Sequence, residues 1–409
     1  MSLFESFKVP AFRYAWSSIS FNSLGNQLNS VALAWLALEF TGSPLGVGVI
    51  LATRNVPRLL LAIPFGILSD RADRRLLLAL ANYAGAVSSL IVAIASGQEW
   101  FGYVALMFAS ATSGVIDVAQ TNWSKAYVFD VVGQKRAVNG LAMEQLANKL
   151  FGMVGGFAGG LLLFHTGAGG IYLAMAVSYT LGALLLNWIK VVGLAARVAS
   201  PVRQQDEEMT PWRVVIHLLR SPVVLLLALI ALSAEVLGYS NEVLWGPFAQ
   251  EVLQRGEVGM GNLIGLLNAG GIVALLLLGM AHRINTYKAV FLVAAGFAIG
   301  LMVFSTTRSM LAAGSVILFV GAAWAVLDSL LPTALQLSVA NEHRGASVGI
   351  WNLSRGFVPI GHLEIGALAA AIGVAATQAI NGFLLLVVVV AAGWMYSRIS
   401  RPAGSRPTD

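Results

Sequence analysis

The sequence predicts an all-α membrane protein with twelve transmembrane helices in two pseudo-symmetric six-helix bundles. Charged residues make up 11% of the chain, whereas soluble proteins carry about 25%, and hydrophobic residues make up 57%. A chain of this composition has too few polar groups to cover its surface, so apolar side chains must face lipid. Twelve mainly apolar segments have the length of about 20 residues that crosses a bilayer: 12–38, 43–69, 76–96, 101–123, 137–164, 171–191, 222–246, 259–281, 289–306, 309–335, 347–370 and 375–397.

The charge distribution predicts which side of the membrane each loop faces. An even number of spans puts both termini on one side, and nineteen lysines and arginines lie near that side, against Arg255 and Arg308 on the other. Positive residues accumulate in cytoplasmic loops, so we expect both termini in the cytoplasm. No cleavage site follows a short apolar core near the N-terminus, which indicates an uncleaved first helix. We therefore expect an integral multi-pass protein of the bacterial cytoplasmic (inner) membrane, monomeric and surrounded by the lipid bilayer.

An internal repeat divides the chain into two halves. The longest polar interval separates residues 1–191 from residues 222–409 and leaves 192–221 as a cytoplasmic linker. Lys149-Leu150-Phe151 aligns without a gap on Arg355-Gly356-Phe357, and glycines further along both segments align as well. Both segments lie in the fifth span of their half. A duplicated six-helix unit with its site at the repeat interface is the plan of many secondary transporters.

A charged hairpin at 66–75 lies between two long apolar runs. Its three arginines and two aspartates need water, so the runs on either side cross the membrane and return on the same face. The pattern G-x-x-x-D-R-x-x-R-R resembles the loop between the second and third helices of major facilitator superfamily transporters. The resemblance implies the major facilitator fold and transport by alternating access.

Further stretches are similar to the branch of that family that contains macrolide-efflux and enterobactin-export proteins, namely residues 32–44, 54–58, 344–345 and 359–361. One position departs from that branch. Members often have Gly-Asp in the first helix, where this chain has Gly25-Asn26. If that aspartate takes part in proton coupling, the role must have moved or be absent here.

The resemblance also implies that the 66–75 loop closes the cytoplasmic side during transport. Asp117 and Asp328 fall in the fourth span of each half. We predict that Asp117 pairs with the loop arginines and that Asp328 pairs with Arg355, in both cases near the cytoplasmic helix ends. The expected gating residues are Asp70, Arg71, Arg74, Asp117, Asp328 and Arg355.

Polar residues inside the first two spans indicate a binding site. Asn22, Asn26, Asn29 and Ser30 follow steps of three and four residues, so they form one stripe that faces either a wet cavity or a neighbouring helix. Arg54 lies near the middle of the membrane, where a guanidinium needs water, substrate or a partner such as Asp117 or Glu144. For Arg58 we expect a structural ion pair. The predicted substrate-binding residues are Asn26, Asn29, Arg54, Lys149, Glu235 and Tyr239.

Carboxylates in the second half are candidates for proton coupling. Glu235 and Glu242 are seven residues apart on one face of the seventh span. Burial disfavours the charged form of a carboxylate, so Glu235 is expected to take up and release a proton. The alternative is a permanent ion pair with Lys149 or Arg355. Glu364 is a further candidate for the coupling proton, although it projects about 200° away from His362, so these two do not form a single site.

The segment 155–160 resembles the antiporter motif G-P-x-x-G-G, with Gly156 in place of the proline, and its glycines allow close helix packing. The resemblance implies export. We therefore predict a proton-coupled exporter of small amphipathic compounds, of the drug or siderophore type; an importer of a metabolite or peptide is the alternative. Five scattered histidines, no cysteine and no Walker sequence argue against an enzyme or an ATP-driven pump. We expect no cofactor, no metal and no nucleic-acid partner.

Overall fold

The computed structural model describes residues 4–98, 100–189, 211–280 and 285–399, and the elements in these ranges are all helical. The first half contains η1 (Glu5–Lys8), α1 (Pro10–Thr41), α2 (Pro44–Arg71), α3 (Arg74–Ala95), α4 (Tyr103–Val132), η2 (Gln134–Arg136) and α5 (Ala137–Asn187). The second half contains α7 (Pro222–Ser233), η3 (Ala234–Gly238), η4 (Tyr239–Asn241), α8 (Glu242–Pro247), η5 (Phe248–Val252), α9 (Gly256–Met280), α10 (Thr286–Thr306), α11 (Met310–Leu337), η6 (Asn341–His343), α12 (Arg344–Gly356), α13 (Val358–Ile372) and α14 (Val374–Ile399).

Nine helical stretches of the described residues are long and apolar enough to cross a membrane. Asparagines and serines lower the hydropathy of α1, and the eleventh predicted span is divided into two short helices, α12 and α13, so neither is among the nine. The fourth predicted span is longer than expected, because α4 continues past residue 123 to Val132. The membrane-spanning architecture predicted from hydropathy is confirmed.

Two glycines bend the chain at equivalent points of the repeat. The 51-residue helix α5 would be about 75 Å long if straight, more than twice the hydrocarbon thickness of a bilayer. Gly167, with φ 62°, turns it back so that it supplies the fifth and sixth spans. Gly373, with φ 87°, separates α13 from α14 at the corresponding position of the second half. The same positive φ, which glycine adopts without strain, supports the internal repeat.

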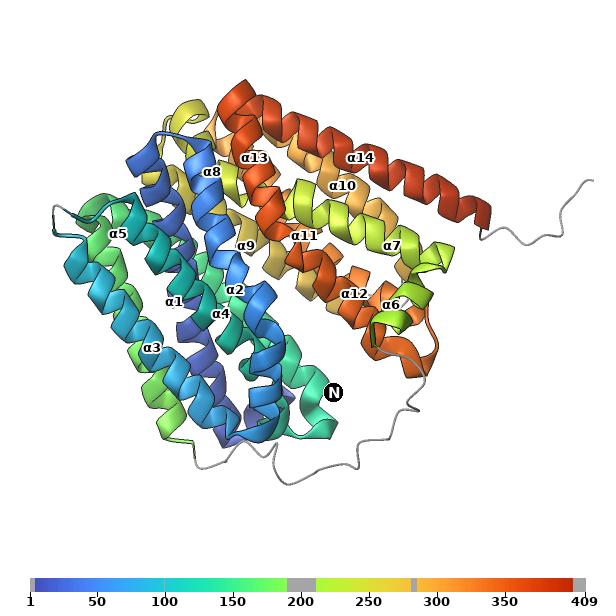
Figure 1. Cartoon of the computed structure of the whole chain (residues 1–409), viewed down its shortest axis with the longest axis horizontal. Coiled ribbons are helices and arrows are strands. Elements are labelled where there is room, and N and C mark those ends of the chain that lie inside the picture. The colour runs from blue at the N-terminus through green and yellow to red at the C-terminus, as the bar shows by residue number, and fades with distance from the viewer. Residues whose placement is uncertain (1–3, 99, 190–210, 281–284, 400–409) are drawn as a thin grey trace, which may run out of the picture.

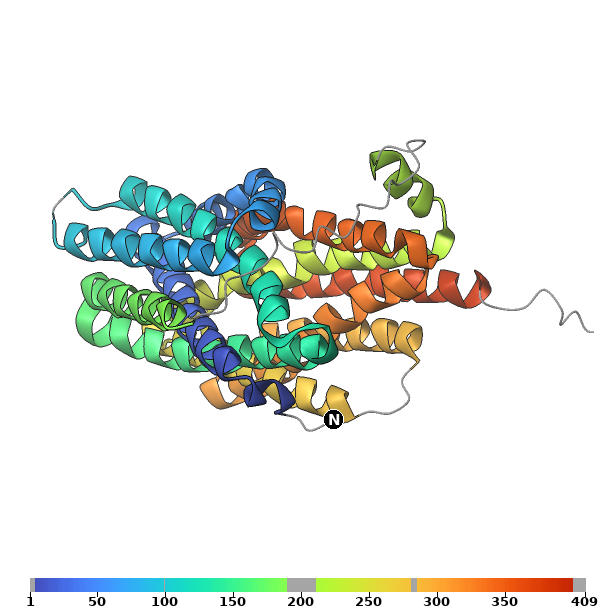
Figure 2. The same ribbon diagram turned by 90° about the horizontal axis from the view of Figure 1, so that it is seen from below.

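The helices gather in two groups (Figure 1). Helices α1 to α5 pack mainly on one another, and α7 to α14 do the same. Seen from below, the first group lies at one end of the molecule and the second at the other (Figure 2). The predicted linker 192–221 falls largely outside the described residues; its last part forms α6 (Pro211–Leu219), which contacts α7 and α12.

Glycines bring the two groups into backbone contact along α5 and α9. A Cβ on Gly156 would lie 2.6 Å from the backbone nitrogen of Gly265, and one on Gly160 would lie 2.7 Å from the carbonyl oxygen of Glu257. A second seam joins α2 to α13, where Gly48 lies against the backbone of His362. The close helix packing predicted for the 155–160 glycines is confirmed. Both seams lie toward the helix ends that are remote from the 66–75 loop.

Candidate substrate cavity

A polar cavity of about 180 Å³ lies between the two bundles. Helices α1, α4 and α5 form its wall on one side, and α11 and α12 form the other. Apart from Ile19, all the side chains that line it are polar or charged: Asn22, Ser23, Asn26, Gln120, Thr121, Ser124, Lys125, Glu144, Gln145, Asn148, Asp328 and Arg355. The volume is smaller than the roughly 300–1,000 Å³ of pockets for drug-sized ligands.

Asn26 joins three helices at the cavity wall. Its Oδ1 accepts a hydrogen bond from the Tyr179 hydroxyl on α5 (2.7 Å), and its Nδ2 donates to Gln120 Oε1 on α4 (3.0 Å). Gln120 in turn donates to Asn82 on α3 (2.7 Å). Asn26 therefore both lines the cavity and holds the bundle together, so the two alternatives for the polar stripe coexist at this residue.

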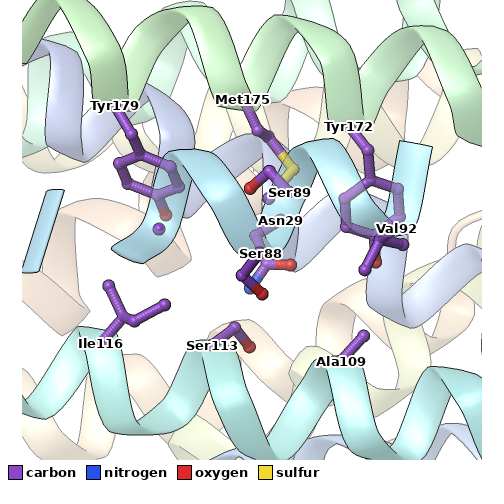
Figure 3. Close-up of a pocket in the computed structure, with 11 residues that line it drawn as sticks. Asn29, Ser88, Ser89, Val92, Ala109, Ser113, Ile116, Tyr172, Met175 and Tyr179 are labelled. Atoms are coloured by element: carbon purple, nitrogen blue, oxygen red, sulfur yellow. The ribbon is translucent and has the colours of Figure 1, made fainter. Parts of the chain in front are cut away.

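Asn29 lies away from that cavity, in the interior of the first bundle. It lines a second cavity of about 10 Å³, the size of one water molecule, together with Ser88, Ser89 and Tyr172 (Figure 3). Its Nδ2 and the Tyr172 hydroxyl have no hydrogen-bond partner among the described residues. Asn26 and Asn29 were predicted to serve one site. The structure places them on two cavities, because three residues along a helix also turn the side chain by about 60°.

The arginines of α2 have partners within the first bundle. Arg54 donates to the hydroxyl of Ser30, and Arg58 forms an ion pair of 2.9 Å with Asp117 on α4. The prediction that Asp117 pairs with the loop arginines is wrong, because Asp117 lies about 22 Å from the end of α4 at Val132. The structural pair expected for Arg58 is confirmed.

At the loop itself, Arg74 binds Asp130 near the end of α4 (2.9 Å) and Asp70 (3.1 Å). Asp73 caps α3 by accepting from the Arg75 backbone nitrogen (2.9 Å), and Arg71 is exposed. These contacts join the ends of α2, α3 and α4 into one unit. The gating role of the loop stays a prediction.

Glu235 pairs with an arginine of its own bundle. It is 3% exposed and lies in the π-helical turn η3, with its Oε1 3.8 Å from Nε of Arg355 on α12. Arg355 also lies in the electrostatic field of Asp328, and both residues line the cavity. Glu235 and Arg54 were predicted to share one substrate site, but Glu235 pairs with Arg355, which is one of the two alternatives for Glu235.

The side chain of Lys149 extends from α5 of the first bundle toward α9 of the second. Its Cδ would lie 3.4 Å from a Cβ on Gly271 of α9, so the glycine leaves room for the lysine chain. Its ammonium interacts electrostatically with Asp328 on α11. Lys149 and Arg355, which align in the repeat, therefore both act on Asp328.

Tyr239, Glu242 and Glu364 contribute no side chain to the cavity wall. The ring of Tyr239 stacks on Trp324 with centroids 4.5 Å apart, inside the second bundle. Glu242 Oε1 lies 2.9 Å from Nε2 of the buried His362, whereas Glu364 accepts from Asn381 on α14 (3.2 Å). His362 and Glu364 thus face different neighbours, as their spacing predicts.

Several cavity residues were missed by the sequence reasoning. Glu144 was considered only as a partner for Arg54. Lys125 lies beyond the predicted span 101–123, but α4 extends to Val132 and includes it. Gln145 and Asn148 were not identified. A signal was present: Glu144 and Asn148 are one turn apart near the start of an otherwise apolar span, which predicts a polar face there.

Comparisons with known proteins agree with this architecture. The family model of the Major Facilitator Superfamily matches residues 15–362. The Staphyloferrin A transporter of Staphylococcus aureus (strain NCTC 8325 / PS 47) is 21% identical over 387 residues, which cover 92% of this chain and 94% of that protein. A bacterial homologue of the human lysosomal transporter Spinster, inward-facing and unoccupied, superposes with a TM-score of 0.71 at 14% identity over 97% of this chain and 99% of its own. The nucleoside transporter NupG superposes with a TM-score of 0.72 at 12% identity, over 94% of this chain and 98% of its own. The chain belongs to the Major Facilitator Superfamily and is a membrane transporter of small molecules.

Proposed function

We propose that this transporter exports small amphipathic compounds of the drug or siderophore type in exchange for protons. The observation that carries the proposal is the Glu235–Arg355 pair, whose arginine lines the polar cavity between the bundles. The side chain of Glu235 is 4% exposed and that of Arg355 is 37% exposed. One partner is thus shielded as a coupling carboxylate would be, and the other can reach a bound compound.

The cavity suits a polar head group of mixed charge. Lys125 and Arg355 supply positive charge, Glu144 and Asp328 can supply negative charge, and amides lie between them. Guanidinium and ammonium groups bind carboxylates and other oxygen donors, and carboxylates bind ammonium groups. Similarity to a transporter named for Staphyloferrin A supports a siderophore-type substrate. The finer grouping with macrolide and enterobactin exporters rests on the residues quoted above.

Proton exchange follows from the electrostatics of the pair. Protonation of Glu235 removes the negative charge that neutralises Arg355, so the cavity gains one positive charge. A cationic substrate group then binds less tightly, and it binds best when the proton has left. Two ligands that weaken each other at one site can drive each other in opposite directions, which is antiport.

The same pair favours the importer alternative for anionic substrates. When Glu235 is protonated, Arg355 is free to bind a carboxylate, so proton and substrate strengthen each other's binding and move together. The sign of the substrate charge therefore decides between exchange and cotransport. The 155–160 segment, which resembles the antiporter motif, favours export.

Transport in membrane vesicles of both orientations tests the proposal. Everted and right-side-out vesicles would be energised with a proton gradient and given a cationic dye, before and after the gradient is collapsed. We expect gradient-dependent accumulation in everted vesicles, absent with Arg355→Ala and present with the control Arg398→Ala, which lies over Trp394 at the end of α14. Accumulation in right-side-out vesicles alone would identify an importer.

A further inference from the structure

Glu144 is a buried carboxylate that the coupling scheme above leaves unused. It lies on α5, lines the central cavity and is 3% exposed. Its Oε1 accepts a hydrogen bond from the Ser124 hydroxyl on α4 (2.9 Å). Its Oε2 is buried and has no hydrogen-bond partner among the described residues. A single hydroxyl thus supports the whole carboxyl group.

Few charges act on this carboxyl group. Lys125 of α4 interacts with it electrostatically, although no cation of the described residues lies within ion-pair distance of Glu144. On the opposite wall of the cavity are Asp328 of α11 and Arg355 of α12. Its neighbours in the wall from α1 and from α5 itself are neutral: Asn22, Ser23, Asn26, Gln145 and Asn148.

The contrast with Glu235 shows what such an environment does to a carboxyl group. Glu235 is equally buried and also has one carboxyl oxygen without a hydrogen-bond partner among the described residues, but Arg355 lies 3.8 Å away and offsets part of its charge. A buried carboxylate with neither a cation nor a full set of hydrogen bonds costs several kcal/mol, so the group takes up a proton instead. A protonated carboxyl also turns Oε2 from an unsatisfied acceptor into a possible donor.

We propose that Glu144 is a second proton-binding site of the transporter, occupied by a proton in the conformation described here. On release, the O–H bond breaks, the proton passes to water in the cavity, and the carboxylate that remains attracts Lys125 or a cationic group of the substrate. Each bundle would then contribute one proton-binding carboxyl group to the cavity region. The role in coupling rests on the proposed function, whereas the resting protonation of Glu144 does not.

Infrared spectroscopy of the purified full-length protein tests the resting protonation directly. The carbonyl stretch of a protonated carboxyl group is separate from the stretches of a carboxylate. At neutral pH and without substrate, we expect Glu144→Gln to remove a protonated-carboxyl band equivalent to one group per protein. The matched control is Glu5→Gln, because Glu5 lies 3.8 Å from Arg136 and should lose carboxylate bands instead.

A second variant keeps the test decisive if Glu144→Gln folds poorly. Ser124→Ala removes the hydrogen bond to Oε1 and should shift the protonated-carboxyl band without abolishing it. Loss of carboxylate bands in Glu144→Gln, or a protonated-carboxyl band unaffected by both variants, would overturn the proposal. Because neither substrate nor gradient is used, a negative result here is distinguishable from a failure of the export proposal, which the vesicle assay reads separately.

Discussion

The arginine–carboxylate pair at the centre of the first bundle is closer than the one in the second. Arg58 and Asp117 approach to 2.9 Å within the first bundle, whereas Glu235 and Arg355 are 3.8 Å apart in the second. The helices also differ. Span four is one continuous helix, α4, but span seven is interrupted by η3, η4 and η5, two of which are π-helical turns. Such turns occur often at functional sites because they place a side chain outside the regular helical register.

This difference indicates that the first bundle forms a rigid wall of the cavity, whereas the wall formed by the second bundle can change its charge. In the first bundle, Asn26 is hydrogen-bonded to both Gln120 and Tyr179, so the wall that they form has a defined shape. In the second, Glu235 lies on the irregular turn and its arginine partner is partly exposed to the cavity. We infer that the charge change caused by protonation of Glu235 acts through the second bundle.

The largest effect is expected from removing the cation of the second bundle. Arg355→Ala leaves Glu235 buried without its partner, which costs about 3–5 kcal/mol when a pair is fully buried and less here because Arg355 is partly exposed. Folded yield and thermal stability in detergent should fall. The double variant Arg355→Ala with Glu235→Gln should recover most of the loss, since no charge is left unpaired. If the double variant instead lost as much stability as Arg355→Ala and Glu235→Gln together, the residues would not be partners.

A smaller loss is expected in the first bundle. Asp117→Asn keeps a hydrogen-bond acceptor for Arg58 but removes its charge, and a hydrogen bond between charged groups contributes about 1.5–3 kcal/mol. Thermal stability should drop by less than this, because both side chains are partly exposed. The proton dependence of transport should be unchanged. A changed dependence would give the Arg58–Asp117 pair a part in proton coupling and contradict its structural role.

The glycine seam between the bundles can be tested by adding one methyl group. Gly156→Ala would force a Cβ to within 2.6 Å of the Gly265 nitrogen, and overpacking of this kind costs about 1–3 kcal/mol. Gly279→Ala is the control, since its Cβ would meet nothing within 4 Å and alanine favours a helix. Thermal stability should fall in the first variant and hold or rise in the second. Equal thermal stability of the two variants would mean that α5 and α9 can move apart without cost.

The smallest effect on stability is expected at the charged loop. Asp70 is exposed and its pair with Arg74 contributes about 0–1 kcal/mol, so Asp70→Asn should leave thermal stability almost unchanged. If the loop closes a gate, transport should fall while substrate affinity stays within a few fold. Transport and binding would be compared at equal protein level. Normal turnover would reject the gating role.

Hydropathy was sufficient to predict a helical membrane protein, because lipid imposes a simple requirement of length and polarity. The partners of the charged residues could not be predicted in the same way, since they depend on the depth of each residue in its helix and on the direction of its side chain. Asp117 was expected at a helix end, but α4 continues beyond it by about four turns. Lys125 lies beyond the predicted span 101–123, but α4 includes it and it lines the cavity.

Polar residues at neighbouring positions of one helix also have different surroundings. Asn26 and Asn29 lie on separate cavities, and Glu235 is oriented by a π-helical turn that the sequence pattern does not reveal. By contrast, Lys149 and Arg355, which the repeat aligns, both interact electrostatically with Asp328. The internal repeat relates positions of the two halves to each other, whereas the sequence pattern around a single polar residue in an apolar span does not predict its neighbours.

The central claim, that Glu235 and Arg355 connect the proton to the substrate, is tested most directly in proteoliposomes. Wild type and Glu235→Gln would be compared in substrate exchange at equilibrium and in accumulation driven by a pH step. Glutamine imitates the protonated carboxyl group, so we expect exchange to continue and gradient-driven accumulation to be lost. Gradient-driven accumulation at the wild-type rate in Glu235→Gln would contradict the account and place the coupling proton on another carboxyl group.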